Sequence, residues 1–205
     1  TLGAWLQLES SSAIGTLTYG VEFYHDDVDS FLRKFPNPAP ADSIQGPVAD
    51  DATYDILDVY LQDKFELCDR LDVTLGVRFS YVSADADSVR HPVTNTQTAI
   101  KDDWKTVVGS SRFRYGMIPD RVVVFGGVSQ GFRAPNLSDL SRFDSARSNE
   151  FEVPSTNLDP ENYITYEIGV KVETEDLAVE TSWFYTDIED QILRFPTGNV
   201  RGGET

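Results

Sequence analysis

Apolar and polar residues alternate along the segment from Asn162 to Glu173. Successive side chains of a β-strand point to opposite faces, so this segment has one apolar and one polar face. The apolar face holds Ile164, Tyr166, Ile168, Val170 and Val172, and the polar face holds Thr165, Glu167, Gly169, Lys171 and Glu173. The segment from Leu71 to Ser83 alternates in the same way. Both segments are therefore predicted to be strands that meet an apolar environment on one side only.

The same alternation predicts a series of antiparallel strands joined by two kinds of connection. The strands are expected at Leu2–Glu9, Ile14–Tyr24, Tyr54–Leu67, Leu71–Ser83, Trp104–Met117, Arg121–Arg133, Asn162–Glu173 and Leu177–Asp187. Tight turns are expected at Ser10–Ser12, Cys68–Arg70, Ile118–Asp120 and Thr174–Asp176, and long polar loops at His25–Thr53, Ala84–Asp103 and Ala134–Glu161. Outer-membrane barrels show this strict alternation of short periplasmic turns and long extracellular loops. The sequence therefore predicts an all-β, antiparallel transmembrane β-barrel segment rather than a soluble sandwich.

The turn at Cys68–Arg70 also predicts the register of its two strands. The expected apolar pairs are Leu61 with Val77, Val59 with Phe79 and Leu57 with Tyr81, and the expected polar pairs are Lys64 with Thr74, Gln62 with Gly76, Tyr60 with Arg78 and Asp58 with Ser80. Both faces agree across the two strands, as a register requires when one face must stay apolar. A loop-side girdle of aromatic residues is expected at Phe79, Tyr81, Tyr166, Trp183 and Tyr185. The strand Arg121–Arg133 is apolar on both faces, so the orientation of Arg133 stays open.

Short motifs in the second half of the chain carry a resemblance to a known family. A strand edge ends in Phe132, Arg133, Ala134 and Pro135; the next begins with Asn157, Leu158, Pro160 and Glu161, and continues with Tyr166, Glu167, Gly169 and Lys171. A further segment, Tyr185–Ile192, reads aromatic-Thr-Asp-Ile-x-Asp-x-Ile. Together these motifs resemble the barrel domain of TonB-dependent outer-membrane receptors, although each motif alone is weak.

The resemblance implies a fold, a compartment and a function. Receptors of this family have about 22 strands around a plugged lumen, so residues 1–205 would supply about eight strands of one barrel domain, without the plug domain and the terminal strands. We expect a receptor of the Gram-negative outer membrane, surrounded by lipid, that imports a ferric siderophore or a similar ferric chelate. The TonB energy-transducing complex would act through the plug, and no cofactor is implied. The alternative is a small outer-membrane barrel with a structural, adhesive or passive-pore role.

The haem-receptor branch of the family is not favoured. In that branch a FRAP box and an NPNL box flank a loop with a haem-ligating histidine. Here Ser155 and Thr156 stand where Asn-Pro would precede Asn157, and the interval from Asn136 to Pro154 contains no histidine. Because haem iron favours an imidazole ligand, we predict that this loop does not ligate haem.

Composition excludes some partners. The chain has 205 residues, 34 acidic and 17 basic side chains, and a formal net charge of -17. A surface that binds nucleic acid needs a basic patch, so nucleic acid is not an expected partner. The single cysteine, Cys68, excludes an intrachain disulfide.

Some patterns resemble catalytic or metal sites, but we favour a structural interpretation for each of them. Residues Gly127–Gly131 satisfy G-x-S-x-G, yet no helix is predicted directly after Ser129 and both histidines precede it. The acidic segments His25–Asp29 and Asp85–Asp87 offer oxygen ligands for a hard cation. Neither has the spacing of a calcium loop, so both are interpreted as solvated acidic loops. No catalytic residue and no metal site are predicted.

Two groups of residues are candidates for contact with a ligand or with the plug. Charged residues on the polar faces are expected to line the lumen and to pair with one another or with the plug: Lys64, Arg78, Arg112, Arg114, Glu167 and Lys171. The loop His25–Thr53 combines aromatic and cationic groups at Phe31, Arg33, Lys34 and Phe35. With Arg133, these could receive an anionic metal chelate, although the loop could equally pack on itself.

Overall fold

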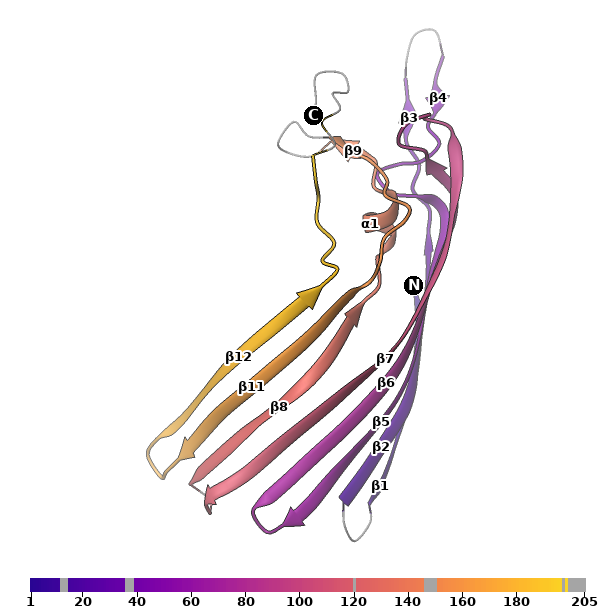
Figure 1. The fold of residues 1–205 in the computed structure, drawn as a ribbon. Helices are drawn as coiled ribbons and strands as arrows, with labels where there is room; N and C mark the ends of the chain where they lie inside the picture. Colours follow the sequence, from indigo (N-terminus) through magenta and orange to yellow (C-terminus); the bar gives the residue numbers. More distant parts are fainter. Residues whose placement is uncertain (12–14, 36–38, 120, 146–150, 197, 199–205) are drawn as a thin grey trace.

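A curved antiparallel sheet makes up most of the chain (Figure 1). The computed structural model describes residues 1–11, 15–35, 39–119, 121–145, 151–196 and 198. The sheet has eight strands in the order β1-β2-β5-β6-β7-β8-β11-β12. Short hairpin turns lie at one end of the sheet, and longer connections with the only helix of the described residues lie at the other (Figure 1). We call these the turn end and the loop end.

The eight strands of the sheet are β1 (Leu2–Ser11), β2 (Gly15–Val28), β5 (Asp50–Cys68), β6 (Leu71–Arg90), β7 (Gln97–Ile118), β8 (Val122–Arg133), β11 (Glu161–Glu173) and β12 (Ala178–Glu189). The loop end carries β3 (Arg33–Lys34), β4 (Ala41–Asp42), α1 (Leu137–Ser141), β9 (Asp144–Ser145) and β10 (Phe151–Glu152). Every strand predicted from alternation is therefore present. Among the described residues, no helix is long and apolar enough to span a membrane.

The predicted connections need correction at the loop end. Residues Ala84–Asp103 are not a long loop, because β6 continues to Arg90 and β7 begins at Gln97. The segment looked polar, but its alternate residues Ala84, Ala86 and Ile100 are buried and still form an apolar face. The other two predicted loops are shorter than expected as well, since β2 runs to Val28, β5 starts at Asp50 and β11 starts at Glu161.

The predicted turns are mostly confirmed. The turn at Asp69 and Arg70 joins β5 to β6, and Thr174 N donates to Leu177 O at 2.8 Å in the turn between β11 and β12. The prediction of the first turn is wrong for Ser10 and Ser11, which still belong to β1. Ser12 of the first predicted turn and Asp120 of the third lie outside the described residues.

The predicted register between β5 and β6 is confirmed. Lys64 lies opposite Thr74, Asp58 opposite Ser80 and Leu61 opposite Val77. Directly opposed residues share a face, so the ladders can be followed across the sheet. Arg112 lies opposite both Thr74 and Gly127, and Gly127 lies opposite Glu167. The charged residues Lys64, Arg78, Arg112, Arg114, Glu167 and Lys171 therefore share one face, as predicted.

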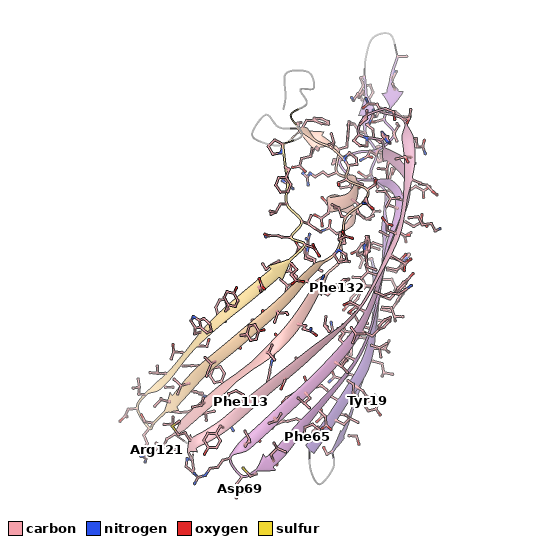
Figure 2. The ribbon with its side chains drawn as sticks, in the orientation of Figure 1. Tyr19, Phe65, Asp69, Phe113, Arg121 and Phe132 are labelled. Carbon is pink, nitrogen blue, oxygen red and sulfur yellow. The ribbon has the colours of Figure 1, made fainter. Side chains whose placement is uncertain are left out.

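We call this charged face the inner face, and the opposite face the outer face. The outer face is apolar and exposed, with Val59, Val77, Ile168 and Trp183 among its members. Four of the five residues of the predicted aromatic girdle, Phe79, Tyr166, Trp183 and Tyr185, are exposed large side chains on it. Figure 2 shows how the turns at Asp69 and Arg121 lie at one end of this wall and Phe132 at the other. An exposed apolar outer face and a charged inner face are typical of a transmembrane barrel wall.

Candidate functional site at the loop end

The sheet splits between β7 and β8 towards its loop end. The two strands pair from Ile118 opposite Val122 up to Ser110 opposite Ser129. Beyond Ser110, β7 continues to pair with β6 as far as Gln97 opposite Arg90, while β8 separates from it (Figure 1). At the point of separation the side chain of Gln130 accepts a hydrogen bond from Gly109 N at 3.0 Å. The wall is therefore open between β7 and β8 on the loop side of Ser110.

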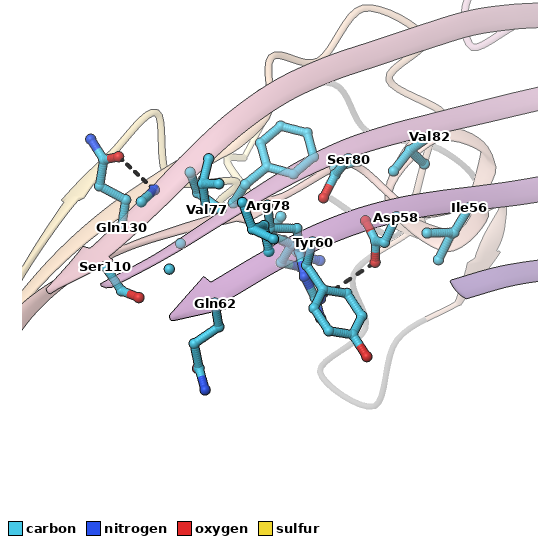
Figure 3. Close-up of a pocket in the computed structure, with 18 of the residues that line it drawn as sticks. Ile56, Asp58, Tyr60, Gln62, Val77, Arg78, Ser80, Val82, Ser110 and Gln130 are labelled. Atoms are coloured by element: carbon cyan, nitrogen blue, oxygen red, sulfur yellow. Dashed lines mark hydrogen bonds and ion pairs between the residues drawn. The ribbon is translucent and has the colours of Figure 1, made fainter. Parts of the chain in front are cut away.

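A cavity of about 620 Å³ lies at this split. Residues of β5, β6, β7 and β8 line it, among them Tyr60, Arg78 and Gln130 (Figure 3). Phe132 at the end of β8 also lines it. Arg78 is already paired, because its guanidinium lies 3.4 Å from Asp58 and 3.8 Å from Glu22 and also stacks over the Tyr60 ring. One cation therefore faces two carboxylates, so this cluster does not offer a free positive charge to an anionic ligand.

The helix α1 covers the inner face beside this cavity. Its N-terminus is fixed by a capping box in which Asn136 accepts from Asp139 N and Asp139 accepts from Asn136 N. The helix buries Leu137 and Leu140 against the core of the loop end. That core comprises Ala49, Ala52, Ala84, Ala86, Val89, Ile100, Leu137 and Leu140. The small alanine side chains let the helix approach the strands closely, so α1 and the residues after it form a cap. We use the word cap for residues 134–145.

Hydrogen bonds hold the cap to β5 and to the segment that precedes it. Gln45 is 1% exposed and donates to Ser141 O at 2.8 Å, while its own oxygen accepts from Arg90 N at 2.6 Å. Ser141 Oγ accepts from Ala49 N at 2.8 Å. Tyr54 donates its hydroxyl to Pro135 O at 3.2 Å. Because buried polar groups cost free energy when unpaired, these bonds specify one position of the cap on this side.

The family motifs meet on the other side of the cap. Arg133 Nη2 lies 2.5 Å from Asp139 Oδ2, and Arg133 Nη1 lies 3.2 Å from Glu161 Oε2. Glu161 also accepts hydrogen bonds from the Tyr163 hydroxyl and, at 2.8 Å, from Ile192 N. Arg133 lies directly opposite Glu161 in the β8–β11 ladder. The open orientation of Arg133 is thereby resolved, since it points to the inner face.

The remaining motif residues have separate positions. Ala134 and Pro135 are buried at the start of the cap, and Leu158 packs against the core of the loop end. Glu167 and Gly169 lie on the inner face and Tyr166 on the outer face, and Lys171 Nζ lies 3.0 Å from Glu173. Asn157 and Pro160 lie in the connection before β11. The motifs therefore describe the wall and the anchoring of the cap more than a single pocket.

The candidate ligand residues of the first loop lie on the β3–β4 hairpin. Phe31 is 80% and Phe35 79% exposed, and Lys34 is exposed as well. Arg33 instead forms a two-pronged contact with Asp42, with Nε 2.6 Å and Nη2 3.2 Å from the carboxylate oxygens. This hydrogen bond holds the pKa of the Asp42 carboxyl below its ordinary value. Within the described ranges, no hydrogen bond or ion pair joins the hairpin to Arg133, so the structure does not unite the predicted candidates in one site.

The weaker candidates keep a structural interpretation, but the prediction that the two acidic segments are loops is wrong, because His25, Asp26 and Asp27 lie in β2 and Asp85–Asp87 lie in β6. Ser129 lies within β8, and α1 begins only at Leu137, after the strand has ended, so no strand-to-helix turn presents this serine. His25 contacts Asp55 at 2.7 Å and Asp27 at 3.2 Å, and Asp85 contacts Lys101 at 2.9 Å. No group of three or more His, Cys, Asp or Glu side chains that could hold a metal ion occurs in the described part of the chain.

Sequence reasoning missed the polar residues that fix the cap, namely Gln45, Asp139, Ser141 and Tyr163. One signal was available, because Asn136 followed three residues later by Asp139 matches the spacing of a capping box. Gln45 and Ser141 carry no such signal, since their contact joins loops far apart in the sequence.

Comparison with known proteins agrees with the geometry. A family model described as "TonB dependent receptor-like, beta-barrel" matches residues 1–205. The pesticin receptor of Yersinia pestis is 28% identical over 158 residues, which cover 73% of this chain and 21% of that protein. The probable TonB-dependent siderophore receptor PirA of Acinetobacter baumannii is 22% identical over 163 residues, covering 73% of this chain and 19% of that protein.

Among solved structures, the copper transporter OprC superposes with a TM-score of 0.72 at 16% identity, covering 92% of this chain and 30% of that chain. At this identity the likeness shows the fold alone. The chain spans about a fifth of the length of the curated relatives that it matches.

Proposed function

Since the chain belongs to the β-barrel family of TonB-dependent receptors, which are outer-membrane proteins of Gram-negative bacteria, we propose that it forms part of the wall of a receptor that imports a ferric siderophore. The observation that carries the proposal is the family match over residues 1–205, together with a wall that is apolar outside and charged inside. A sequence relative named as a siderophore receptor supports iron chelates as cargo.

Three further features belong to the proposal. The wall would be completed to about 22 strands by residues outside this chain, as in plugged transporters of the outer membrane. A plug domain outside this chain would fill the lumen, and the TonB complex would supply energy by acting on that plug. Residues 1–205 would then be part of a single barrel domain.

The β3–β4 hairpin is the proposed first contact for the chelate. Phe31, Lys34 and Phe35 are exposed there and combine aromatic surface with a positive charge. Arg33 and Arg133 remain candidates, but each is held by carboxylates. An anionic chelate would have to compete with Asp42 for the first guanidinium, or with Asp139 and Glu161 for the second. The aromatic rings and Lys34 are therefore favoured as the initial contacts.

Uptake by living cells tests the cargo and the energy source. The full-length protein is expressed in a Gram-negative strain that lacks its own siderophore receptors, and uptake of radioactive iron is measured with a ferric catecholate and a ferric phenolate siderophore. The expected result is saturable uptake of one of them, lost when tonB is deleted. Copper(II) uptake is measured in the same strain, and TonB-dependent uptake of copper without uptake of either ferric siderophore would contradict the proposed cargo. TonB-independent passage of unrelated small solutes would overturn the proposal in favour of a passive pore.

Substitution tests the hairpin. The double variant Phe31→Ala/Phe35→Ala should bind the transported chelate roughly tenfold more weakly, since exposed aromatic anchors often dominate a contact. Val93→Ala is the matched control, because Val93 is likewise 80% exposed in the turn between β6 and β7. Equal affinity of both variants and the unchanged protein would exclude the hairpin as a contact.

A further inference from the structure

The carboxylate of Glu161 joins segments of the loop end that are far apart in the sequence. Glu161 is 5% exposed, and its oxygens accept from the Tyr163 hydroxyl, from Ile192 N and from the Arg133 guanidinium. These partners belong to β11, to the segment after β12 and to the end of β8. A buried carboxylate requires such partners, because an unpaired charge in this position is strongly unfavourable.

Arg133 extends this junction to the cap. Its second nitrogen lies 2.5 Å from Asp139, which is the same side chain that closes the capping box of α1 by accepting from Asn136 N at 3.1 Å. The ion pair with Arg133 and the capping box of α1 therefore share the carboxylate of Asp139. Loss of the Glu161 charge leaves Arg133 paired with Asp139 alone, so its side chain no longer ties the first turn of α1 to β11.

The opposite side of the cap is held independently by Gln45 and Ala49 in the connection before β5 and by Tyr54 on β5. The cap thus spans the split between β7 and β8 and is fixed once on each side. Phe132 and Arg133, which lead into the cap, and Ala134, its first residue, also line the cavity at the split. The position of Arg133 therefore sets where the cap begins relative to that cavity.

We propose that Glu161 is a positioning residue that fixes the cap over the cavity, and that it does so through Arg133 while separately holding the segment after β12 through Ile192 N. The role lies in placing the cap and not in contacting the cargo, so it stands whichever nutrient the protein carries.

Hydrogen exchange of the full-length protein in detergent, without any ligand, tests the proposal. Mass spectrometry follows peptides that cover residues 137–142 and residues 190–195. In Glu161→Ala, exchange should become about tenfold faster or more in both peptides, because a buried acceptor of charged and backbone hydrogen bonds is lost. Unchanged exchange in residues 137–142 of a folded Glu161→Ala protein would overturn the proposal.

Two more variants separate the two arms of the junction. Glu161→Gln keeps an oxygen that can accept from Ile192 N but removes the charge opposite Arg133, so residues 137–142 should loosen and residues 190–195 should stay protected. Arg133→Gln should give the same pattern. If Glu161→Ala fails to fold, Glu161→Gln and Arg133→Gln test the proposal in its place. The proposal is overturned if neither variant speeds hydrogen exchange in residues 137–142.

Glu189 provides the matched control. It lies at the same end of the sheet, at the end of the neighbouring strand β12, and forms no ion pair within the described residues. Glu189→Ala and Glu189→Gln should leave both peptides unchanged. Equal loosening in the Glu189 and Glu161 variants would show a general effect of charge at the loop end and would contradict a specific role of Glu161.

Discussion

Replacement of Gly169 by alanine tests whether the inner face is packed as the structure shows. Gly169 is buried in β11 and lies directly opposite Phe125 of β8. A Cβ atom at this position would press against the Phe125 ring and would lie 2.7 Å from the backbone oxygen of Thr181. The ring can turn aside, but the neighbouring strand can move only by disturbing its ladder. Overpacking of this kind costs about 1–3 kcal/mol.

Gly109→Ala is the matched control for this substitution. A Cβ at Gly109 would meet Gln130 Oε1 at 3.6 Å and Gly76 O at 3.8 Å, which are ordinary contacts. Alanine is favoured over glycine inside a strand by about 0.5–1 kcal/mol, and both variants receive this gain. Gly109→Ala should therefore be slightly more stable than the unchanged protein. Gly169→Ala should lie about 1–3 kcal/mol below Gly109→Ala in free energy of unfolding.

The measurement is urea unfolding of the full-length protein in detergent, followed by loss of heat modifiability on a gel. The reasoning is refuted if the two variants unfold at the same urea concentration. A second result must also hold, because the clash involves the ring of Phe125. Phe125→Leu should cost less stability in the Gly169→Ala background than in the unchanged protein, and additive effects would exclude the proposed contact.

Three other predictions concern separate parts of the chain. The isolated 205-residue chain should aggregate in detergent rather than give a monodisperse folded barrel, since β1 and β12 each pair on one side only and lipid does not tolerate unpaired strand edges. Haemin titration of the full-length protein should show no Soret shift that depends on residues 136–154, because that loop contains no histidine. Protection of the Ser43 amide, which bonds Leu32 O at 2.8 Å, should fall as the pH drops below the ordinary Asp value of 3.8, because Asp42 has a lowered pKa and loses its charge there. Hydrogen exchange of the Asp42→Asn variant should show no such pH dependence at Ser43. The same pH dependence in Asp42→Asn as in the unchanged protein would contradict the prediction.

The strands could be predicted because each of them meets two different environments. Alternation forced by an apolar outer face and a charged inner face located the strands and fixed the β5–β6 register to the residue. The same logic failed for residues 84–103, where the outer face is no longer apolar and the inner face is built from alanines. The alternation of alanine with aspartate lacks large apolar side chains and was therefore interpreted as a polar loop, although Ala84 and Ala86 are fully buried.

The loop end could be predicted only in part, because its contacts join distant segments. The motif around Arg133 marked where the wall ends, but its partner Asp139 follows in a stretch without periodicity. The contact between Gln45 and Ser141 depends on how two loops fold over one another. Polar loop residues of this kind look like any solvated residue until their burial is known.

The motif at the end of β8 can be explained by geometry, and the explanation limits what it says about cargo. Pro135 has no N–H to donate, so the strand ladder cannot continue past it and the chain turns into the cap. Ala134 is small enough to be buried at that turn, and Arg133 directly before it anchors the cap to Asp139 and Glu161. None of these roles requires a particular ligand. The motif therefore specifies how the wall ends beside the cavity and how the cap is anchored there, and it does not by itself identify a cargo.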